Sequence, residues 1–239
     1  MCYRYSIFSK PEMFKAKFNA TLDKDFTPKY HVSAFSQQKL PIITNDNSDK
    51  IQLASWGLVP HWAKTVKQAE EIRVKTANAR AETIYEKPSF RHSAKNNHCL
   101  VIADGFFEWR EVNKRKYPYF IRLKNQQPFA MAGLWENWTN PESEERQITY
   151  TIITTEANPM MQIVHNQKKR MPVILPDGFE RFWLNELDKE KAEKLLVPFE
   201  QDKMEAYTIS KLITAKDKDP NVSQVLMPYS YPGVEARFG

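Results

Sequence analysis

The sequence has few cysteines and no long apolar run, and each of these absences excludes a class of protein. The only cysteines are Cys2 and Cys99, which excludes a disulfide framework and a cysteine-rich zinc site. No run of roughly 18 or more apolar residues appears, and Arg4 and Lys10 break up the start of the chain, so neither a membrane span nor a signal peptide is expected. We therefore expect a soluble, cytoplasmic protein with no membrane partner.

Several chemical motifs are also missing. The sequence contains no P-loop, no GxGxxG and no GxSxG, which argues against nucleotide phosphate binding and against a nucleophile-elbow hydrolase. Its histidines show neither HxxxH nor HxH spacing, so we expect no metal site and no cofactor. These histidines are His31, His61, His92, His98 and His165.

The composition does offer a positive signal. The formal net charge is +6 and aromatic residues make up 13% of the chain. Proteins that bind single-stranded nucleic acid combine cationic grooves with rings that stack on bases. A basic balance permits such a partner without demonstrating it, and we expect most of the tryptophans to lie in the core, with one or two on a ligand surface.

The periodicity predicts strands separated by turns, with few helices. Short intervals between strands favour antiparallel pairing, so we expect an α+β fold with a curved, mostly antiparallel, barrel-like sheet and peripheral helices. One domain over 1–239 is expected, with a core over 2–215, a loosely docked tail over 216–239 and no heptads that would indicate an oligomer. The predicted strands are 39–44, 52–59, 100–110, 117–123, 129–136, 148–155 and 171–175, and the predicted helices begin near Pro11 with Ser9 as cap and cover 64–72, 80–85, 88–94, 178–186 and 189–196.

Cys2 directly follows the initiator methionine. Removal of Met1 would leave Cys2 with a free α-amine beside its thiol, which is a 1,2-aminothiol. An amine with a pKa of roughly 7.7 to 8.0 can attack an aldehyde, and the thiol can then close onto the imine carbon to give a thiazolidine. The position alone is equally compatible with an unimportant small residue at a frayed terminus.

Two polar positions could take part in such chemistry. Glu108 lies among aromatic residues in the segment 103–110, where desolvation would raise its pKa and let it move protons near neutral pH. An edge-strand glutamate paired with Arg110 is the alternative. His165 leads into the cationic loop 166–170 and could donate a proton beside a phosphate, although a lone histidine is more often structural.

Two further features suit a polyanionic ligand. Asn78 and Arg80 lie at a predicted loop-to-helix junction, where they could position a polar atom and grip a phosphate, or could act as an ordinary helix cap and surface ion pair. Trp56 and Trp62 flank a turn that contains Gly57 and Pro60 and could present a stacking ring, although Trp56 also suits the core.

Taken together, these motifs resemble the SRAP family, the SOS response-associated peptidase domain proteins, and especially its bacterial single-domain members. Five co-linear motifs over about residues 2 to 215 carry the resemblance: Cys2 with Arg4, 56–60, 78–83, 104–109, and His165 with 170–172.

The resemblance implies a sensor of abasic sites in single-stranded DNA that forms a covalent crosslink through a thiazolidine at Cys2, with autoprocessing peptidase and lyase-type chemistry. It also implies that the protein becomes nucleoid-associated when bound to DNA. Asn78 would orient the N-terminus or the sugar, Glu108 would be the acid/base group, and His165 would assist sugar-ring opening and crosslink reversal. The DNA-binding set implied is Arg4, Trp56, Trp62, Arg80 and Arg170.

Three departures from the family pattern are visible. Tyr3 stands where family members usually have glycine, and His31 takes the place of an asparagine in the segment 30–34. The loop between His165 and Pro172 is longer than usual.

Two other classes of function stay open at this point. An N-terminal-nucleophile peptidase would use the thiol of Cys2 to attack a peptide bond, with its own amine as base. A noncatalytic single-stranded DNA-binding module would use the aromatic and basic residues alone.

Overall fold

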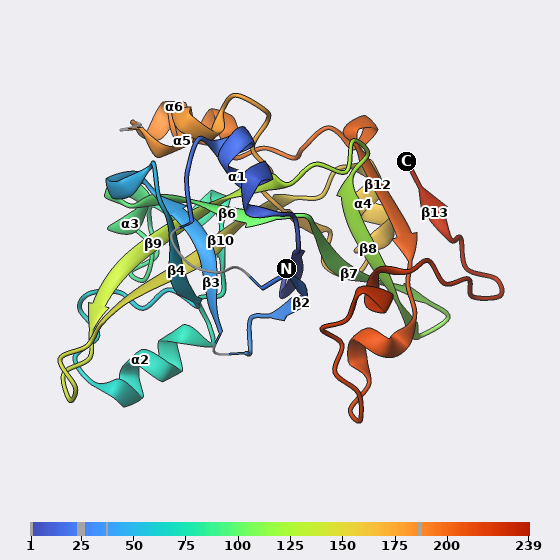
Figure 1. Ribbon diagram of the computed structural model, residues 1–239, viewed down its shortest axis with the longest axis horizontal. Helices are drawn as coiled ribbons and strands as arrows, with labels where there is room; N and C mark the ends of the chain where they lie inside the picture. The colour runs from blue at the N-terminus through green and yellow to red at the C-terminus, as the bar shows by residue number, and fades with distance from the viewer. Residues whose placement is uncertain (1, 23–26, 37, 186–187) are drawn as a thin grey trace.

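The computed structural model describes residues 2–22, 27–36, 38–185 and 188–239. Two β-sheets form its centre, and short helices lie around them (Figure 1). The strands are β1 (Arg4–Ile7), β2 (Lys29–Ser33), β3 (Lys39–Thr44), β4 (Ile51–Trp56), β5 (Asn78–Arg80), β6 (His98–Ala103), β7 (Gly105–Val112), β8 (Arg115–Leu123), β9 (Phe129–Thr139), β10 (Arg146–Glu156), β11 (Arg170–Pro172), β12 (Met204–Thr208) and β13 (Arg237–Phe238). The α-helices are α1 (Pro11–Phe18), α2 (Val66–Arg73), α3 (Ser93–Asn96), α4 (Pro159–Val164), α5 (Glu180–Leu184) and α6 (Lys189–Leu195), and the 3-10 turns are η1 (Asn45–Asn47), η2 (Ala81–Thr83), η3 (Gln201–Lys203), η4 (Lys211–Thr214) and η5 (Ser223–Leu226).

The larger sheet closes on itself. Its strands follow the order β11-β10-β4-β3-β6-β9, and β9 also pairs with β10, so β10, β4, β3, β6 and β9 form a ring. Most pairings are antiparallel, but β10 runs parallel to β4 and to β5. A closed ring leaves none of its own strands as a free edge, because each is hydrogen-bonded on both sides.

The second sheet has the order β13-β12-β8-β7-β1-β2 and is antiparallel in the pairings described. The chain passes from the ring into this sheet between β6 and β7, at Asp104. The buried Asp104 carboxylate accepts hydrogen bonds from the backbone N–H of Phe8 and of Ser9, at 2.5 and 2.8 Å, and from the Ser9 hydroxyl. Gly105 follows because a Cβ there would overlap the ring of Phe120 on β8. This junction fixes the start of β7, which carries Glu108.

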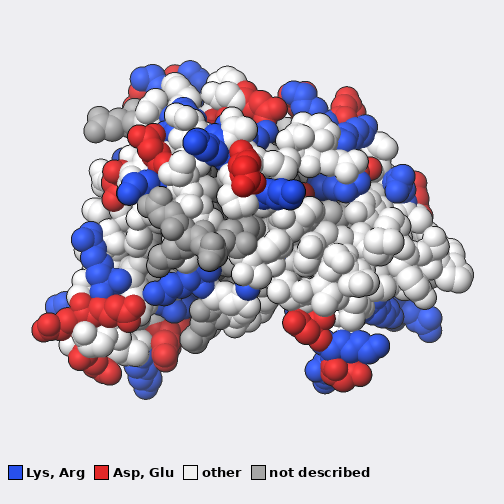
Figure 2. Space-filling model, viewed as in Figure 1, with Lys and Arg blue, Asp and Glu red and all other residues white. Residues whose placement is uncertain are grey.

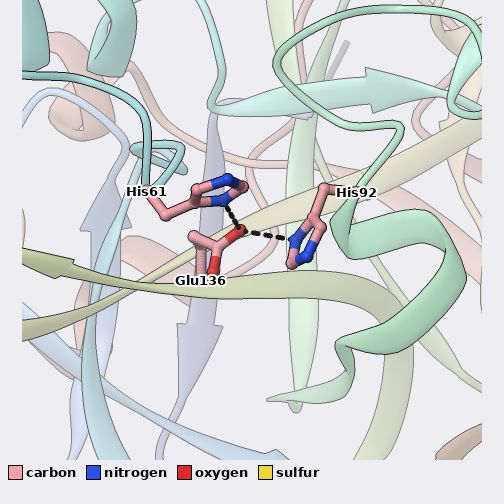
Figure 3. Close-up of side chains that lie close together, drawn as sticks. All are labelled: His61, His92 and Glu136. Carbon is pink, nitrogen blue, oxygen red and sulfur yellow. Dashed lines mark hydrogen bonds and ion pairs between the residues drawn. The ribbon is translucent and has the colours of Figure 1, made fainter.

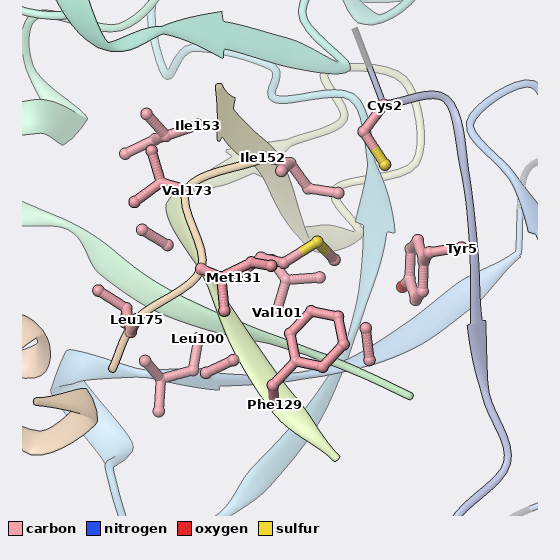
Figure 4. Close-up of a cluster of buried hydrophobic side chains, with 14 of the residues drawn as sticks. Cys2, Tyr5, Leu100, Val101, Phe129, Met131, Ile152, Ile153, Val173 and Leu175 are labelled. Carbon is pink, nitrogen blue, oxygen red and sulfur yellow. The ribbon is translucent and has the colours of Figure 1, made fainter. Parts of the chain in front are cut away.

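One continuous hydrophobic cluster joins the two sheets. It contains Tyr5 and Phe106 from the six-stranded sheet and Ile42, Leu100 and Ile152 from the ring, all at most 1% exposed. Figure 4 shows part of this cluster, with Cys2 and Tyr5 facing residues of the ring strands. We propose on this basis that the two sheets fold as one domain.

The α+β class and the curved, mostly antiparallel, barrel-like sheet are confirmed. The strand at 39–44 is found with the predicted bounds, but the single strand predicted over 100–110 is two strands that bend apart at Asp104. Residues 80–85 and 88–94 form mainly short turns, and Ser9 bonds to Asp104 while Lys10 stands at the N-cap of α1. Helix α4 was not predicted, and the end of the helix predicted over 178–186 lies outside the described residues.

The expectation of a loosely docked tail over 216–239 is wrong. Strand β13 pairs with β12 and so becomes the edge of the six-stranded sheet, and Val225 is fully buried. The hydrophobic face of β12 and β8 needs this cover, which the polar, weakly periodic sequence of the segment does not reveal. Within the described residues, no helix has both the length and the apolar character needed to cross a membrane.

Candidate active site

Cys2 lies immediately before β1 and is fully buried. Its sulfur points into the hydrophobic cluster beside Tyr5 and Ile152 (Figure 4) and lies 3.6 Å from the Arg4 carbonyl oxygen, to which the thiol donates. Burial, and after it the negative charge of Glu108, raises the pKa of the Cys2 thiol well above its ordinary value. The thiol is therefore protonated at neutral pH.

Asn78 holds the backbone of Cys2. Its side-chain Nδ2 donates a hydrogen bond to the Cys2 carbonyl oxygen at 2.8 Å. The position of Asn78 is set by the parallel pairing of β5 with β10, in which Asn78 is opposite Ile152, and by the indole of Trp56, which donates to the carbonyl of the preceding Ala77 at 2.7 Å. A rigid strand therefore fixes the residue that anchors the N-terminal segment.

Glu108 and His165 form a buried pair. Glu108 projects from β7, and its Oε2 lies 3.4 Å from His165 Nε2. His165 follows helix α4, which begins with the Asn158 side chain accepting from the Met161 N–H and with Pro159 in the first helical position. The sequence signal for this helix was the Asn-Pro pair, which marks a helix start.

The protonation state of this pair follows from its burial. Desolvation raises the pKa of Glu108 to about 8 and lowers the pKa of His165 to about 4. At neutral pH both groups are therefore uncharged. His165 Nδ1–H donates to the Arg170 carbonyl oxygen at 2.8 Å, so the atom that lies 3.4 Å from Glu108 Oε2 is the unprotonated Nε2 of the neutral ring. The site thus holds a protonated carboxyl beside a neutral imidazole.

A cavity of about 630 Å³ opens over this pair. Tyr3 and Arg4, the two residues that follow Cys2, line it together with Glu108 and His165. Its other lining residues are Phe35, Trp109, Lys116, Pro118, Gln167, Lys168, Lys211 and Thr214. The cavity therefore joins the N-terminal segment to the proton-carrying pair.

The cavity lining is cationic and aromatic. Glu108 is the only acidic residue among the described lining residues, which include four cationic side chains, Arg4, Lys116, Lys168 and Lys211. The Arg4 guanidinium lies over the Trp109 ring, 5.1 Å from its centroid. Tyr3 and Phe35 stack with centroids 5.5 Å apart, and Phe35 is 66% exposed. This pairing of positive charge with exposed rings is what a flexible polyanion bearing planar groups requires.

On the face seen in Figure 2, lysines and arginines are interspersed with acidic side chains, and uncharged described residues gather to the right of the centre. The described cavity lining instead carries four cationic side chains and one acidic one. A ligand that follows the positive charge would therefore be guided by the lysines of the cavity.

Two residues of the expected DNA-binding set do not have that role. Trp56 is 3% exposed and its ring stacks with Tyr150 inside the core. Arg170 is buried, and its guanidinium makes a two-pronged ion pair with Glu82, at 2.5 and 3.0 Å. Both expectations were wrong because they rested on residue type. In the folded chain the Trp56 ring is packed in the core and the Arg170 guanidinium is paired with Glu82, so neither side chain is available at the surface.

Of the other expected residues, Arg4 lines the cavity, and Arg80 on β5 is exposed. Trp62 is 38% exposed in the turn after β4, and its Nε1 donates to the Pro88 carbonyl oxygen at 3.4 Å. Contact of Arg80 and Trp62 with DNA stays a prediction.

Sequence reasoning missed much of the cavity wall. Lys168 belongs to the basic loop 166–170 that was noted, but Phe35, Lys116 and Lys211 come from segments distant in sequence and carry no local signal. Trp109 could have been found, since it neighbours Glu108. A separate cluster of His61, His92 and Glu136 is the group of described residues whose atoms lie close enough together to hold a metal ion.

Known proteins resemble this chain over most of its length. The sequence model of the SOS response associated peptidase (SRAP) family matches residues 1–216. The Bacillus subtilis (strain 168) protein named abasic site processing protein YoqW is 40% identical over 229 residues, which cover 93% of this chain and 98% of that protein. Abasic site processing protein HMCES of Xenopus tropicalis is 32% identical over 206 residues, which cover 73% of this chain and 59% of that protein.

The fold is shared with solved structures. The crystal structure of a Bacteroides thetaiotaomicron protein superimposes with a TM-score of 0.88 at 38% identity and covers 94% of this chain and 98% of its own. A Bordetella bronchiseptica protein gives 0.77 at 25% identity, over 87% of this chain and all of its own. Since the family match spans most of the sequence and relatives of this similarity extend over nearly its whole length, the chain belongs to the SOS response associated peptidase (SRAP) family.

Proposed function

We propose that this protein processes abasic sites in single-stranded DNA by capturing the sugar aldehyde covalently at Cys2. The observation that carries the proposal is the arrangement of the N-terminal segment. Cys2 is anchored by Asn78, and the residues directly after it line a cationic, aromatic cavity that also contains the Glu108–His165 pair. Its relatives named abasic site processing proteins support the substrate class.

The chemistry would start at the amine. Removal of Met1 would free the α-amine of Cys2, and because burial keeps the thiol protonated, the amine is the group able to attack the aldehyde carbon first. The resulting carbinolamine loses water to give an imine, with Glu108 donating the proton that turns the hydroxyl into water. The thiol then adds to the imine carbon and its proton passes to the nitrogen, so aldehyde and aminothiol become a thiazolidine and one water.

His165 would act as a proton acceptor and donor next to Glu108. Its Nε2 lies 3.4 Å from Glu108 Oε2 and its Nδ1–H is fixed on the Arg170 carbonyl, so Nε2 can receive a proton from the sugar hydroxyl as the ring opens and return it on reversal. Arg4, Lys168 and Lys211 would contact phosphates, and the exposed ring of Phe35 would stack on an unpaired base.

A crosslinking assay tests the proposal. The processed protein is mixed with a single-stranded oligonucleotide that contains one abasic site, and adducts are separated under denaturing conditions before and after heating. We expect a heat-stable adduct with the wild type and with Cys99→Ala, which removes the other buried cysteine, and loss of the heat-stable adduct with Cys2→Ser. The serine variant can still form an imine through its amine, so heat stability is the deciding readout.

The alternatives predict other results. A peptidase acting in trans would cleave an added peptide and leave the oligonucleotide free. A noncatalytic binding module would bind intact and abasic strands equally and give no covalent product. An undiminished heat-stable adduct with Cys2→Ser would refute the thiazolidine.

A further inference from the structure

Two histidines and a glutamate meet outside the lining of the active-site cavity. His61 belongs to the turn after β4, His92 precedes α3, and Glu136 projects from β9. Figure 3 shows both imidazoles directed at the same carboxylate oxygen. His61 Nδ1 lies 3.2 Å and His92 Nδ1 lies 3.1 Å from Glu136 Oε2. The active-site chemistry uses none of the three.

These distances fit a bound cation. Zinc binds imidazole nitrogen and carboxylate oxygen at about 2.0–2.1 Å, so an ion equidistant from a nitrogen and an oxygen 3.1–3.2 Å apart would have an N–metal–O angle of about 100°. That angle lies between the octahedral and tetrahedral values. The ligand atoms of all three residues lie within 4.8 Å of one another, so a small rotation of either exposed ring would complete the site.

Neighbouring groups hold the carboxylate in place. Ser93 Oγ donates to Glu136 Oε2 at 3.2 Å and Asn97 Nδ2 donates to Oε1 at 3.3 Å. Hydrogen bonds of this kind orient the carboxylate ligands of metal sites. The turn that carries His61 is also fixed, because Trp138 Nε1 donates to the Ala63 carbonyl oxygen at 2.7 Å.

The charge balance favours a cation as well. Glu136 is only 5% exposed, and among the described residues neither a lysine nor an arginine forms an ion pair with it. A buried carboxylate without a fixed positive partner gains most from a divalent ion. The side chains of His61 and His92 are 50% and 51% exposed, so an ion can enter from solvent and keep water as its remaining ligand.

We propose that His61, His92 and Glu136 form a binding site for a divalent transition-metal ion of the Zn²⁺ class. Each imidazole would ligate through Nδ1 and carry its proton on Nε2. Two nitrogen ligands select Zn²⁺, Co²⁺ or Ni²⁺ over Mg²⁺ and Ca²⁺, which prefer oxygen. The expectation of no metal site rested on short-range spacing, whereas these histidines stand 75 and 44 positions from Glu136.

The ion would join three parts of the chain, namely the turn at 60–63, the segment 88–97 and strand β9. Trp62, whose indole already contacts the Pro88 carbonyl, lies in the joined turn. The bound metal would therefore hold these three parts of the chain together next to Trp62. Because it binds the folded protein, it would also stabilise the fold by mass action.

Equilibrium dialysis against Zn²⁺, followed by metal quantification, tests the site in the full-length chain without an affinity tag. The background carries Cys2→Ser, because an N-terminal aminothiol itself binds Zn²⁺. The test variants are His61→Asn and His92→Asn, in which an amide takes the place of Nδ1 and can still donate to Glu136 while offering a much weaker ligand. His31→Asn on β2 is the matched control, and Glu136→Gln is a further test whose folding is checked by circular dichroism.

We expect one Zn²⁺ per chain in the background and in the His31 variant, and at least a tenfold weaker affinity in each of the other two histidine variants. The rise in Tm on adding Zn²⁺ should disappear in the same two variants, and Mg²⁺ should cause none. Absence of Zn²⁺ binding in the background, or equal affinity after His61→Asn and His92→Asn, would overturn the proposal. Because both histidines are half-exposed, their variants decide the question even if Glu136→Gln does not fold.

Discussion

Replacement of Glu108 by glutamine tests the proton stored in the active site. Burial raises the pKa of Glu108 from 4.5 to about 8, so between these values the folded protein holds a proton that the unfolded chain has released. The stability that Glu108 contributes is therefore full at low pH and is lost as the pH rises toward 8. Glutamine has the shape of the protonated acid but does not titrate, so the variant lacks this loss.

The size of the effect follows from the two pKa values. Linkage between about pH 6.5 and about pH 8 gives a change of roughly 1–2 kcal/mol in the free energy of unfolding of the wild type relative to Glu108→Gln. This window avoids His165, whose pKa burial lowers from 6.5 to about 4, so its contribution is lost only as the pH falls below 6.5.

Urea unfolding followed by tryptophan fluorescence measures the difference at each pH, with both proteins carrying the same N-terminus. We expect Glu108→Gln to gain stability over the wild type as the pH rises. The companion variant His165→Asn should show the opposite dependence, with its stability relative to the wild type increasing as the pH falls from 6.5 toward 4. A difference between wild type and Glu108→Gln that stays constant from pH 6.5 to 8 would refute the assignment of a neutral carboxyl at this site.

Three further predictions concern the anchor, the cavity and the strand junction. Asn78→Ala removes a hydrogen bond worth about 0.5–1.5 kcal/mol, and should slow adduct formation about two- to tenfold in single-turnover assays; an unchanged rate would contradict the anchoring role. Lys168→Ala should reduce the slope of log affinity against log salt for single-stranded DNA by roughly 0.7, whereas Lys189→Ala on α6, outside the cavity, should leave that slope unchanged. Gly105→Ala places a methyl group in the Phe120 ring and should lower the free energy of unfolding by about 1–3 kcal/mol, as measured in urea; a neutral result would show that the junction relaxes freely.

Local sequence patterns predicted individual strands, but they did not predict how strands distant in sequence pair. The strand at 39–44 and the strands predicted over 129–136 and 148–155, which correspond to β9 and β10, follow from apolar runs separated by polar turns. The parallel pairing of β10 with β4 and β5 has no local signature, because it depends on strands that are distant in sequence. The bend at Asp104 was hidden for a similar reason, since its cause is the contact with Ser9 in another segment.

The candidate site was also predicted only in part. Motifs predicted roles for Cys2, Asn78, Glu108 and His165, and these roles stay predictions. In the structure Asn78 is hydrogen-bonded to the Cys2 carbonyl, and Glu108 lies beside His165 in the cavity lining. Burial could not be read from residue type, so the indole of Trp56 and the guanidinium of Arg170 were given a role at the surface.

Two of the lysines that line the cavity were missed because they come from separate elements, with Lys116 on strand β8 and Lys211 in the 3-10 turn η4. Each is an ordinary surface lysine in the sequence, and only the folded chain gathers them around one opening.

The depth of Cys2 has a consequence for the lifetime of the protein. Peroxides and alkylating agents react with an accessible thiolate, whereas the Cys2 sulfur is fully buried and held as a thiol. The residue is therefore shielded from oxidation to sulfenic and sulfinic acid. If Cys2 captures abasic sites as proposed, conditions that damage DNA by oxidation would leave its thiol chemically intact.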